Sequence, residues 1–92
     1  MSSVNIQVTG KVQGVSYRYS TKKKAKSVQL TGWVKNLPDG SVQIYAQGAD
    51  SSIASLIEWC HHGPASAIVK DVIVEELNKS PAIHLKSFEI IR

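Results

Sequence analysis

The residues best suited to chemistry lie in one short segment, VTGKVQGVSYRYS, which runs from Val8 to Ser20. It contains Gly10 and Gly14, no acidic residue, and one arginine, Arg18. Backbone amides near glycine can converge on an anion at the start of a helix, and glycine accepts a positive φ. A guanidinium adds parallel N–H donors and a permanent positive charge. The segment therefore has the composition of a phosphate-binding loop, in which Gly14 is the residue expected to need a positive φ.

Two common phosphate-binding motifs do not match this segment. The Walker loop requires Gly-Lys-Ser/Thr after its first glycine, and the dinucleotide fingerprint requires GxGxxG; neither occurs here. On these residues alone, an ordinary strand-to-helix turn with a solvent-exposed Arg18 is the alternative interpretation.

A second informative segment, GWVKNLPDGSVQIYAQG, covers Gly32 to Gly48. Within it, Asn36 ends a predicted short strand just before the hairpin turn, and Asp39 with Gly40 has strong turn chemistry. The side-chain amide of Asn36 donates and accepts hydrogen bonds at once, so it is able to hold a water molecule. A turn-forming asparagine is the alternative interpretation of the same residue.

The elements that must position these residues follow from the hydrophobic periodicity. Strands are predicted at 4–8, 33–35 and 42–46, and the last two form a hairpin. Between the first two strands, four side chains recur at helical spacing: Tyr17, Thr21, Ala25 and Val28. They predict a helix from about Ser16 to Ser27 or Val28, which begins directly after the glycine-containing loop.

A second helix is predicted from an apolar stripe in the second half of the chain. Its members are Ile53, Leu56, Ile57 and Cys60. Asp50 or Ser51 is the expected cap of this helix, because short polar side chains are favoured there. Gly63 and Pro64 follow in the order typical of a helix end.

The order of the elements sets the expected fold. Further strands are predicted at 68–76 and in the final segment 84–92, separated by the turn-rich stretch 78–82. The resulting order is β-α-β-β-α-β, with the last strand as a possible additional edge. We therefore expect residues 1–92 to form a single domain of the α+β class. It is a ferredoxin-like βαββαβ sandwich, in which one mostly antiparallel sheet of four to five strands carries two helices on one face.

The composition indicates the class of protein and its location in the cell, but it does not identify a binding partner. Apolar residues make up 42% of the chain and charged residues 20%, as in a globular protein. No apolar run approaches the roughly 20 residues that cross a bilayer, and the N-terminus lacks the pattern of a secretory signal. These features predict a cytoplasmic protein. The net charge of +4 attracts anions, although the four lysines of Lys22–Lys26 also suit an ordinary solvated helix face.

The remaining metal-binding and nucleophilic residue types have structural interpretations. Cys60 lies on the apolar stripe and is expected to be a core thiol, and the Cys-x5-Arg spacing of thiol phosphatases is absent. His61 and His62 are adjacent, so they cannot face one ion from a helix, and they suit a helix end. His84 is expected to have a structural role at the start of the last strand. No metal and no cofactor is expected.

Taken together, the two segments resemble the acylphosphatase family. Residues Gly10–Arg18 follow its pattern G-x-V-Q-G-V-x-[aromatic or Met]-R, and Gly32–Val42 follow G-[aromatic]-V-x-N-x-x-x-G-x-V. The order, separation and chain length also fit, so the resemblance covers essentially the whole chain. It implies a small ferredoxin-like enzyme that hydrolyses the carboxyl–phosphate bond of acyl phosphates.

The resemblance also implies roles for individual residues. Arg18 would be a catalytic residue that clamps the phosphate, and Asn36 would be a catalytic residue that orients the attacking water. The substrate-binding loop would consist of Gln13, Gly14, Val15, Ser16, Tyr17 and Arg18. Two positions depart from the family: Tyr17 replaces a phenylalanine or methionine, and Gln43 replaces a glutamate found in many relatives. We expect both departures to adjust local packing and to leave activity intact.

Two other functions are compatible with the predicted fold. A phosphate- or acyl-phosphate-sensing module would use the same loop without turnover, although it would have no need for a water held by Asn36. An RNA-binding domain would stack bases on sheet aromatics, but the required aromatic and glycine pattern is missing from 42–46. We therefore expect a monomeric enzyme that acts on a small-molecule acyl phosphate and binds neither nucleic acid nor membrane.

Overall fold

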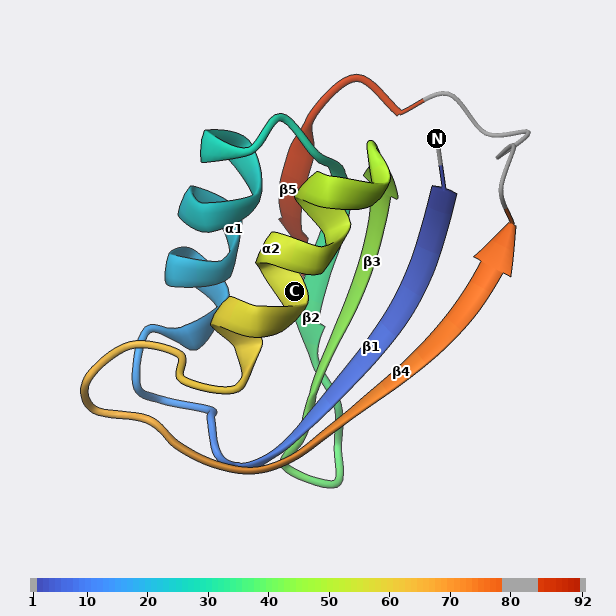
Figure 1. Cartoon of the computed structure of the whole chain (residues 1–92). Coiled ribbons are helices and arrows are strands. Elements are labelled where there is room, and N and C mark those ends of the chain that lie inside the picture. Colours follow the sequence, from blue (N-terminus) through green and yellow to red (C-terminus); the bar gives the residue numbers. More distant parts are fainter. Residues whose placement is uncertain (1, 79–84, 92) are drawn as a thin grey trace.

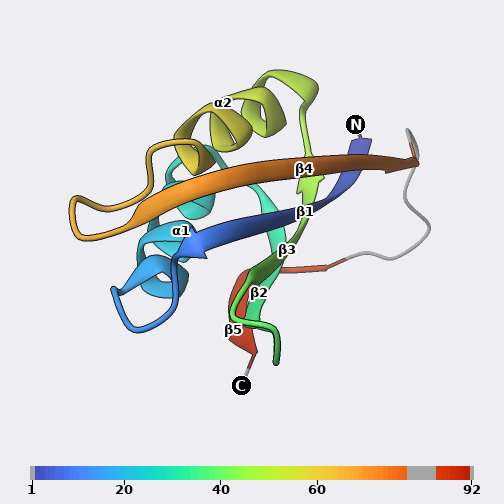
Figure 2. The same cartoon turned by 90° about the horizontal axis from the view of Figure 1, so that it is seen from below.

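The computed structural model of the chain describes residues 2–78 and 85–91. In chain order its elements are β1 (Ser2–Lys11), α1 (Tyr17–Ser27), β2 (Thr31–Asn36), β3 (Val42–Gly48), α2 (Asp50–Cys60), β4 (Ile68–Asn78) and β5 (Phe88–Ile91). Figures 1 and 2 show that the strands form one twisted sheet and that both helices lie on the same face of it. The predicted ferredoxin-like α+β fold is thereby confirmed.

The sheet has five strands in the order β4-β1-β3-β2-β5. All neighbouring pairs are antiparallel except β2 and β5, which are parallel, so β5 is the additional edge that the sequence allowed for. Val42, the first residue of β3, pairs with Val8 near the end of β1 and with Asn36 at the end of β2. This register brings the β1–α1 loop and Asn36 to the same end of the sheet.

The core lies between the sheet and the two helices. The apolar stripes of both helices face it, with Tyr17, Thr21 and Ala25 buried in α1 and Ile53, Leu56 and Cys60 buried in α2. Among the residues that the structure describes, no helix lies on the opposite face of the sheet (Figure 2). There the rings of Trp33 and Tyr45 stack at 5.9 Å. The periodicities in the sequence therefore identified the buried face of each helix.

Several boundaries differ from the predicted ones. The expected cap of the second helix is wrong: Ala49 precedes α2 without a side-chain cap, and Asp50 is the first helical residue. The Asp50 carboxylate instead accepts a hydrogen bond from the Ser2 hydroxyl, and its charge suits the positive end of the helix dipole. The strand predicted at 33–35 is longer, because β2 pairs along both of its edges.

The end of the predicted fourth strand also moves, since β4 extends to Asn78. The rest of the turn predicted at 78–82, together with His84, lies outside the described residues. Neither helix of the described part of the chain is long and apolar enough to cross a membrane.

Candidate phosphate-binding site

The loop between β1 and α1 contains two left-handed residues in close succession. Gly14 has φ 73°, as expected for the residue that needs this freedom, and Ser16 has φ 63°. Ser16 is also the N-cap of α1, and its side chain makes no capping hydrogen bond. The first turn of α1 contains no acidic residue. The amides that begin an α-helix lack intrahelical acceptors, so this helix start offers unopposed donors and a positive dipole end to an anion.

One side of the loop is fixed to the β2–β3 hairpin by the side chain of Gln13. Its amide nitrogen donates to the carbonyl oxygens of Leu37 and Ser41, each at 2.8 Å. The turn that carries these carbonyls is itself ordered by Asp39, which accepts hydrogen bonds from the hydroxyl and backbone amide of Ser41. These hydrogen bonds hold the pKa of Asp39 below its usual value. Gln13 therefore connects the loop rigidly to the segment that follows Asn36.

The other side of the loop is supported by the connection between α2 and β4. The Tyr17 hydroxyl donates to the carbonyl oxygen of Cys60 at 2.8 Å, which satisfies the one polar atom that this departure from the family introduces. The Tyr17 ring also packs 5.4 Å from the ring of Trp59. In addition, the Ser66 hydroxyl donates to the carbonyl oxygen of Val15 at 3.2 Å. The loop is thus held from two directions.

Cys60 itself is part of the core and not of the site. Its side chain is fully buried, which confirms the expected core thiol. Burial raises the pKa of the thiol to about 12, so the nucleophilic thiolate is disfavoured at neutral pH. The chemistry of this end of the molecule must therefore come from other groups.

A cleft of about 420 Å³ opens where the loop, α1, β2 and β5 meet. It is lined by Val12, Gly14, Ser16, Tyr17, Arg18, Tyr19, Asn36 and Ile90. Within the described residues, Arg18 has no ion-pair partner, and the buried Oδ1 of Asn36 has no hydrogen-bond partner. The cleft therefore contains an unpaired cation, and the Asn36 side chain beside it has a buried oxygen without a partner in the described chain.

The residues singled out in the sequence are distributed unequally around this cleft. Arg18 and Asn36 come from different elements and line it together, with Gly14, Ser16 and Tyr17 of the loop. Two loop residues are not among its lining. The Gln13 side chain is engaged with the hairpin, and the Val15 side chain packs against the core.

Tyr19 and Ile90 are two lining residues that the sequence analysis missed. Tyr19 is 64% exposed although it is large and largely apolar, and its position next to Arg18 did not by itself suggest a role. The sequence could have indicated that Ile90 faces the helices, because it alternates with Phe88 in the last strand and Phe88 is buried. Ile90 lies beside the cleft because β5 pairs in parallel with β2, and hydrophobic periodicity does not predict that pairing.

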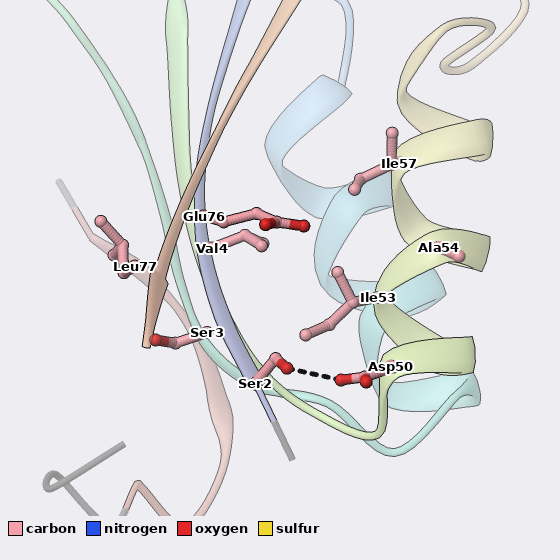
Figure 3. Close-up of a pocket in the computed structure, with 9 residues that line it drawn as sticks. All are labelled: Ser2, Ser3, Val4, Asp50, Ile53, Ala54, Ile57, Glu76 and Leu77. Atoms are coloured by element: carbon pink, nitrogen blue, oxygen red, sulfur yellow. Dashed lines mark hydrogen bonds between the residues drawn. The ribbon is translucent and has the colours of Figure 1, made fainter. Parts of the chain in front are cut away.

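A second cavity, of about 450 Å³, lies between α2 and the β1–β4 edge of the sheet (Figure 3). Apolar side chains of Val4, Ile53 and Ile57 line it, but so do the carboxylates of Asp50 and Glu76. Two carboxylates repel a phosphate group. The cleft that contains Arg18 is therefore the candidate phosphate site.

Comparisons with known proteins agree with this geometry. The family model described as Acylphosphatase matches residues 4–90. An acylphosphatase of Marinobacter nauticus is 53% identical over 73 residues, which is 79% of each chain. One of Acaryochloris marina is 48% identical over 92% of this chain and 88% of its own. The crystal structure of acylphosphatase from Bacillus subtilis superposes with a TM-score of 0.93 at 37% identity, over 100% of both chains.

Proposed function

The chain belongs to the acylphosphatase family, and from that premise we propose that its Arg18 cleft hydrolyses the carboxyl–phosphate bond of acyl phosphates. The products are a carboxylate and inorganic phosphate. The observation that carries this proposal is the meeting of Arg18 and Asn36, from different elements, in one cleft at the start of a helix. Acylphosphatases are hydrolases that act on acid anhydrides, and an acyl phosphate is a mixed anhydride of this kind.

Binding of the phosphate falls to the β1–α1 loop and to Arg18. Backbone amides of residues 13–18 donate to the phosphate oxygens, helped by the positive end of the α1 dipole. The Arg18 guanidinium adds charge-assisted hydrogen bonds from parallel N–H donors. Its lack of an ion-pair partner within the described residues supports this role, because no carboxylate has to be displaced first.

Asn36 positions the attacking water. Its amide is essentially non-basic, so it acts by orientation and not by removing a proton. The place of Asn36 in the cleft lining, together with Arg18, supports this role, because a side-chain amide can hydrogen-bond a water molecule there. Holding that water in line with the phosphorus and the leaving oxygen lowers the entropic part of the barrier.

The bond changes need neither a general acid nor a resident metal. The water oxygen bonds to phosphorus while the bond from phosphorus to the acyl oxygen breaks, and its electron pair leaves on the carboxylate. A carboxylate whose acid has a pKa of about 4 to 5 departs readily as an anion. The loose transition state mainly requires positioning and charge stabilisation, which Arg18 and the loop amides supply. The water proton passes to a phosphate oxygen.

We further propose that the protein works as a cytoplasmic monomer on small-molecule acyl phosphates, with no part for nucleic acid. The position of the lysine cluster supports the last point, because Lys22–Lys26 lie on α1, whereas bases would stack on the open sheet face, where Lys35 lies over the Trp33 ring.

Hydrolysis of benzoyl phosphate by purified protein with excess chelator tests the proposal. Wild type is expected to turn over the substrate, and Arg18→Gln is expected to lose at least about a hundredfold in kcat/KM together with its affinity for inorganic phosphate. Asn36→Ala is expected to lose turnover while it retains phosphate affinity.

Each unexpected outcome has a distinct meaning. Folded wild type that binds phosphate without turnover would favour the sensing module. Full activity in Asn36→Ala would remove the proposed role of that residue. Equal phosphate affinity in Arg18→Gln and wild type would remove the clamp.

A further inference from the structure

The cleft has an apolar half that phosphate binding does not use. Its polar lining consists of Gly14, Ser16, Arg18 and Asn36. The remaining lining is apolar or aromatic and consists of Val12, Tyr17, Tyr19 and Ile90. An acyl phosphate has the same division, because a charged phosphate is joined to an uncharged acyl group.

Two of the four apolar side chains are not accessible to a ligand. Val12 and Tyr17 are each only 1% exposed. Tyr17 is also committed to the interior, since its hydroxyl donates to the Cys60 carbonyl and its ring packs on Trp59. These two residues form the floor of the cleft and offer almost no surface for packing.

The other two side chains do offer surface. Tyr19 is 64% exposed, and Ile90 is only partly buried against the core. They come from α1 and β5, which contact each other (Figure 1). Because consecutive residues of a helix project about 100° apart, Arg18 and Tyr19 are directed to different parts of the same cleft.

We propose that Tyr19 and Ile90 form the subsite for the acyl group, and that the enzyme therefore prefers acyl phosphates with an aromatic or other bulky apolar acyl group over acetyl phosphate. This inference rests on the proposed function, since it concerns the leaving portion of the same substrate. A flat aryl group packs against the Tyr19 ring in an offset or tilted arrangement and covers apolar surface that is otherwise exposed to water. An acetyl group is too small to cover both side chains.

The ratio of kcat/KM for benzoyl phosphate to that for acetyl phosphate tests the subsite. Tyr19→Ala is expected to lower this ratio about two- to tenfold, mainly through a higher KM for benzoyl phosphate. Tyr19→Phe keeps the ring and is expected to keep the ratio. Ile91→Ala is the control and is expected to keep the ratio. Ile91 is an exposed apolar residue of β5, the strand that contains Ile90, but it is not among the cleft lining. An unchanged ratio in Tyr19→Ala would overturn the inference.

Binding of non-hydrolysable phosphonates separates this inference from the proposed function. Wild type is expected to bind benzylphosphonate more tightly than methylphosphonate, and Tyr19→Ala is expected to reduce that preference. If wild type hydrolyses neither acyl phosphate but shows this Tyr19-dependent preference, the catalytic proposal fails and the aryl subsite stands. If turnover occurs and the preference is the same in Tyr19→Ala, the subsite is wrong and the catalytic proposal stands.

Discussion

At the level of single residues, Ser16 has the least expected backbone of the site. It adopts φ 63° although it is not glycine, and its side chain makes no capping hydrogen bond in return. The left-handed conformation costs a non-glycine residue roughly 1–2 kcal/mol. Because Ser16 lines the cleft and is the N-cap residue of α1, this strain lies at the point where the phosphate would bind. Strained backbone conformations of this kind cluster at active sites and ligand-binding sites.

Substitutions of Ser16 should therefore change stability in opposite directions. Ser16→Gly is expected to raise the free energy of unfolding by up to about 1 kcal/mol, since relief of the strain exceeds the entropy that glycine adds to the unfolded chain. Ser16→Val is expected to lower it by at least about 1 kcal/mol, because a β-branched side chain resists this conformation. Urea unfolding measures both variants. Equal free energies of unfolding for Ser16→Gly and Ser16→Val would contradict the assignment of backbone strain to Ser16.

Cys60 and Tyr17 should make the protein sensitive to alkali. Burial raises the pKa of the Cys60 thiol from 9.0 to about 12, and burial also raises the pKa of the Tyr17 phenol far above its ordinary 10.0. A group whose pKa is higher in the folded state than in the unfolded state stabilises the fold at pH values below its unfolded-state pKa. This contribution is lost as the pH rises toward the folded-state pKa. The free energy of unfolding should therefore fall by roughly 1 kcal/mol per pH unit from about pH 9, and more steeply above pH 10.

Unfolding of Cys60→Ala by urea between pH 8 and pH 11 isolates the thiol. Its overall stability should be lower because of the cavity, but the decline should begin nearer pH 10. A decline that still begins at pH 9 in this variant would assign the effect to another group.

At the level of elements, the site depends on how two loops are joined. Gln13 links the β1–α1 loop to carbonyls at Leu37 and Ser41, on the hairpin that begins after Asn36. The side chain thus sets the distance between the proposed phosphate-binding loop and the residue proposed to hold the water. A displacement of about 1 Å between reacting groups can cost roughly a hundredfold in rate.

Gln13→Met should therefore reduce activity without touching the substrate directly. It retains the size of the side chain but loses both donors, so kcat/KM for benzoyl phosphate is expected to fall at least about tenfold. Gln7→Met is the matched control, because Gln7 also bonds to the hairpin, through the Ser41 hydroxyl at 3.1 Å, but lies outside the loop. A similar effect in both variants would indicate general weakening of the hairpin.

The sequence specified the elements more fully than it specified their contacts. The stripe of Tyr17, Thr21 and Ala25 and the strand alternation reflect local periodicity, so the fold and the buried faces were predictable. The positive φ of Gly14 was predictable because glycine is the residue that adopts it most readily. The conformation of Ser16 and the paired hydrogen bonds of Gln13 depend on surfaces from distant parts of the chain, and no local pattern contains them.

At the level of the whole molecule, charge is separated between two regions. Helix α1 carries Arg18 and four lysines and no acidic residue. Five of the seven acidic residues lie in α2 and β4: Asp50, Glu58, Asp71, Glu75 and Glu76. In the described chain, Lys22 is the lysine of α1 that forms an ion pair, with Glu89 at 3.6 Å. The positive region begins at the cleft and should attract anionic substrates.

The rate with an anionic substrate should consequently depend on salt. For benzoyl phosphate, kcat/KM is expected to fall severalfold as ionic strength rises, and Lys23→Gln should reduce this dependence. Lys23 lies five residues after Arg18 on the same helix, about 8 Å farther along its axis. Lys86→Gln is the control, since this exposed lysine lies outside α1, before β5 begins at Phe88. The same salt dependence in both variants would exclude steering by α1.

The outer edge of β4 has a consequence for solubility. As a terminal strand of the sheet, it leaves a row of backbone donors and acceptors unpaired along one side, and Ile73 is 57% exposed beside them. An antiparallel match between two copies centred on Ile73 would place Asp71 of each against Glu75 of the other, a repulsive pair, and Lys70 against Glu76, an attractive pair. The charged residues of β4 act as gatekeepers against edge-to-edge aggregation in another way, because burying them between two copies would cost their hydration.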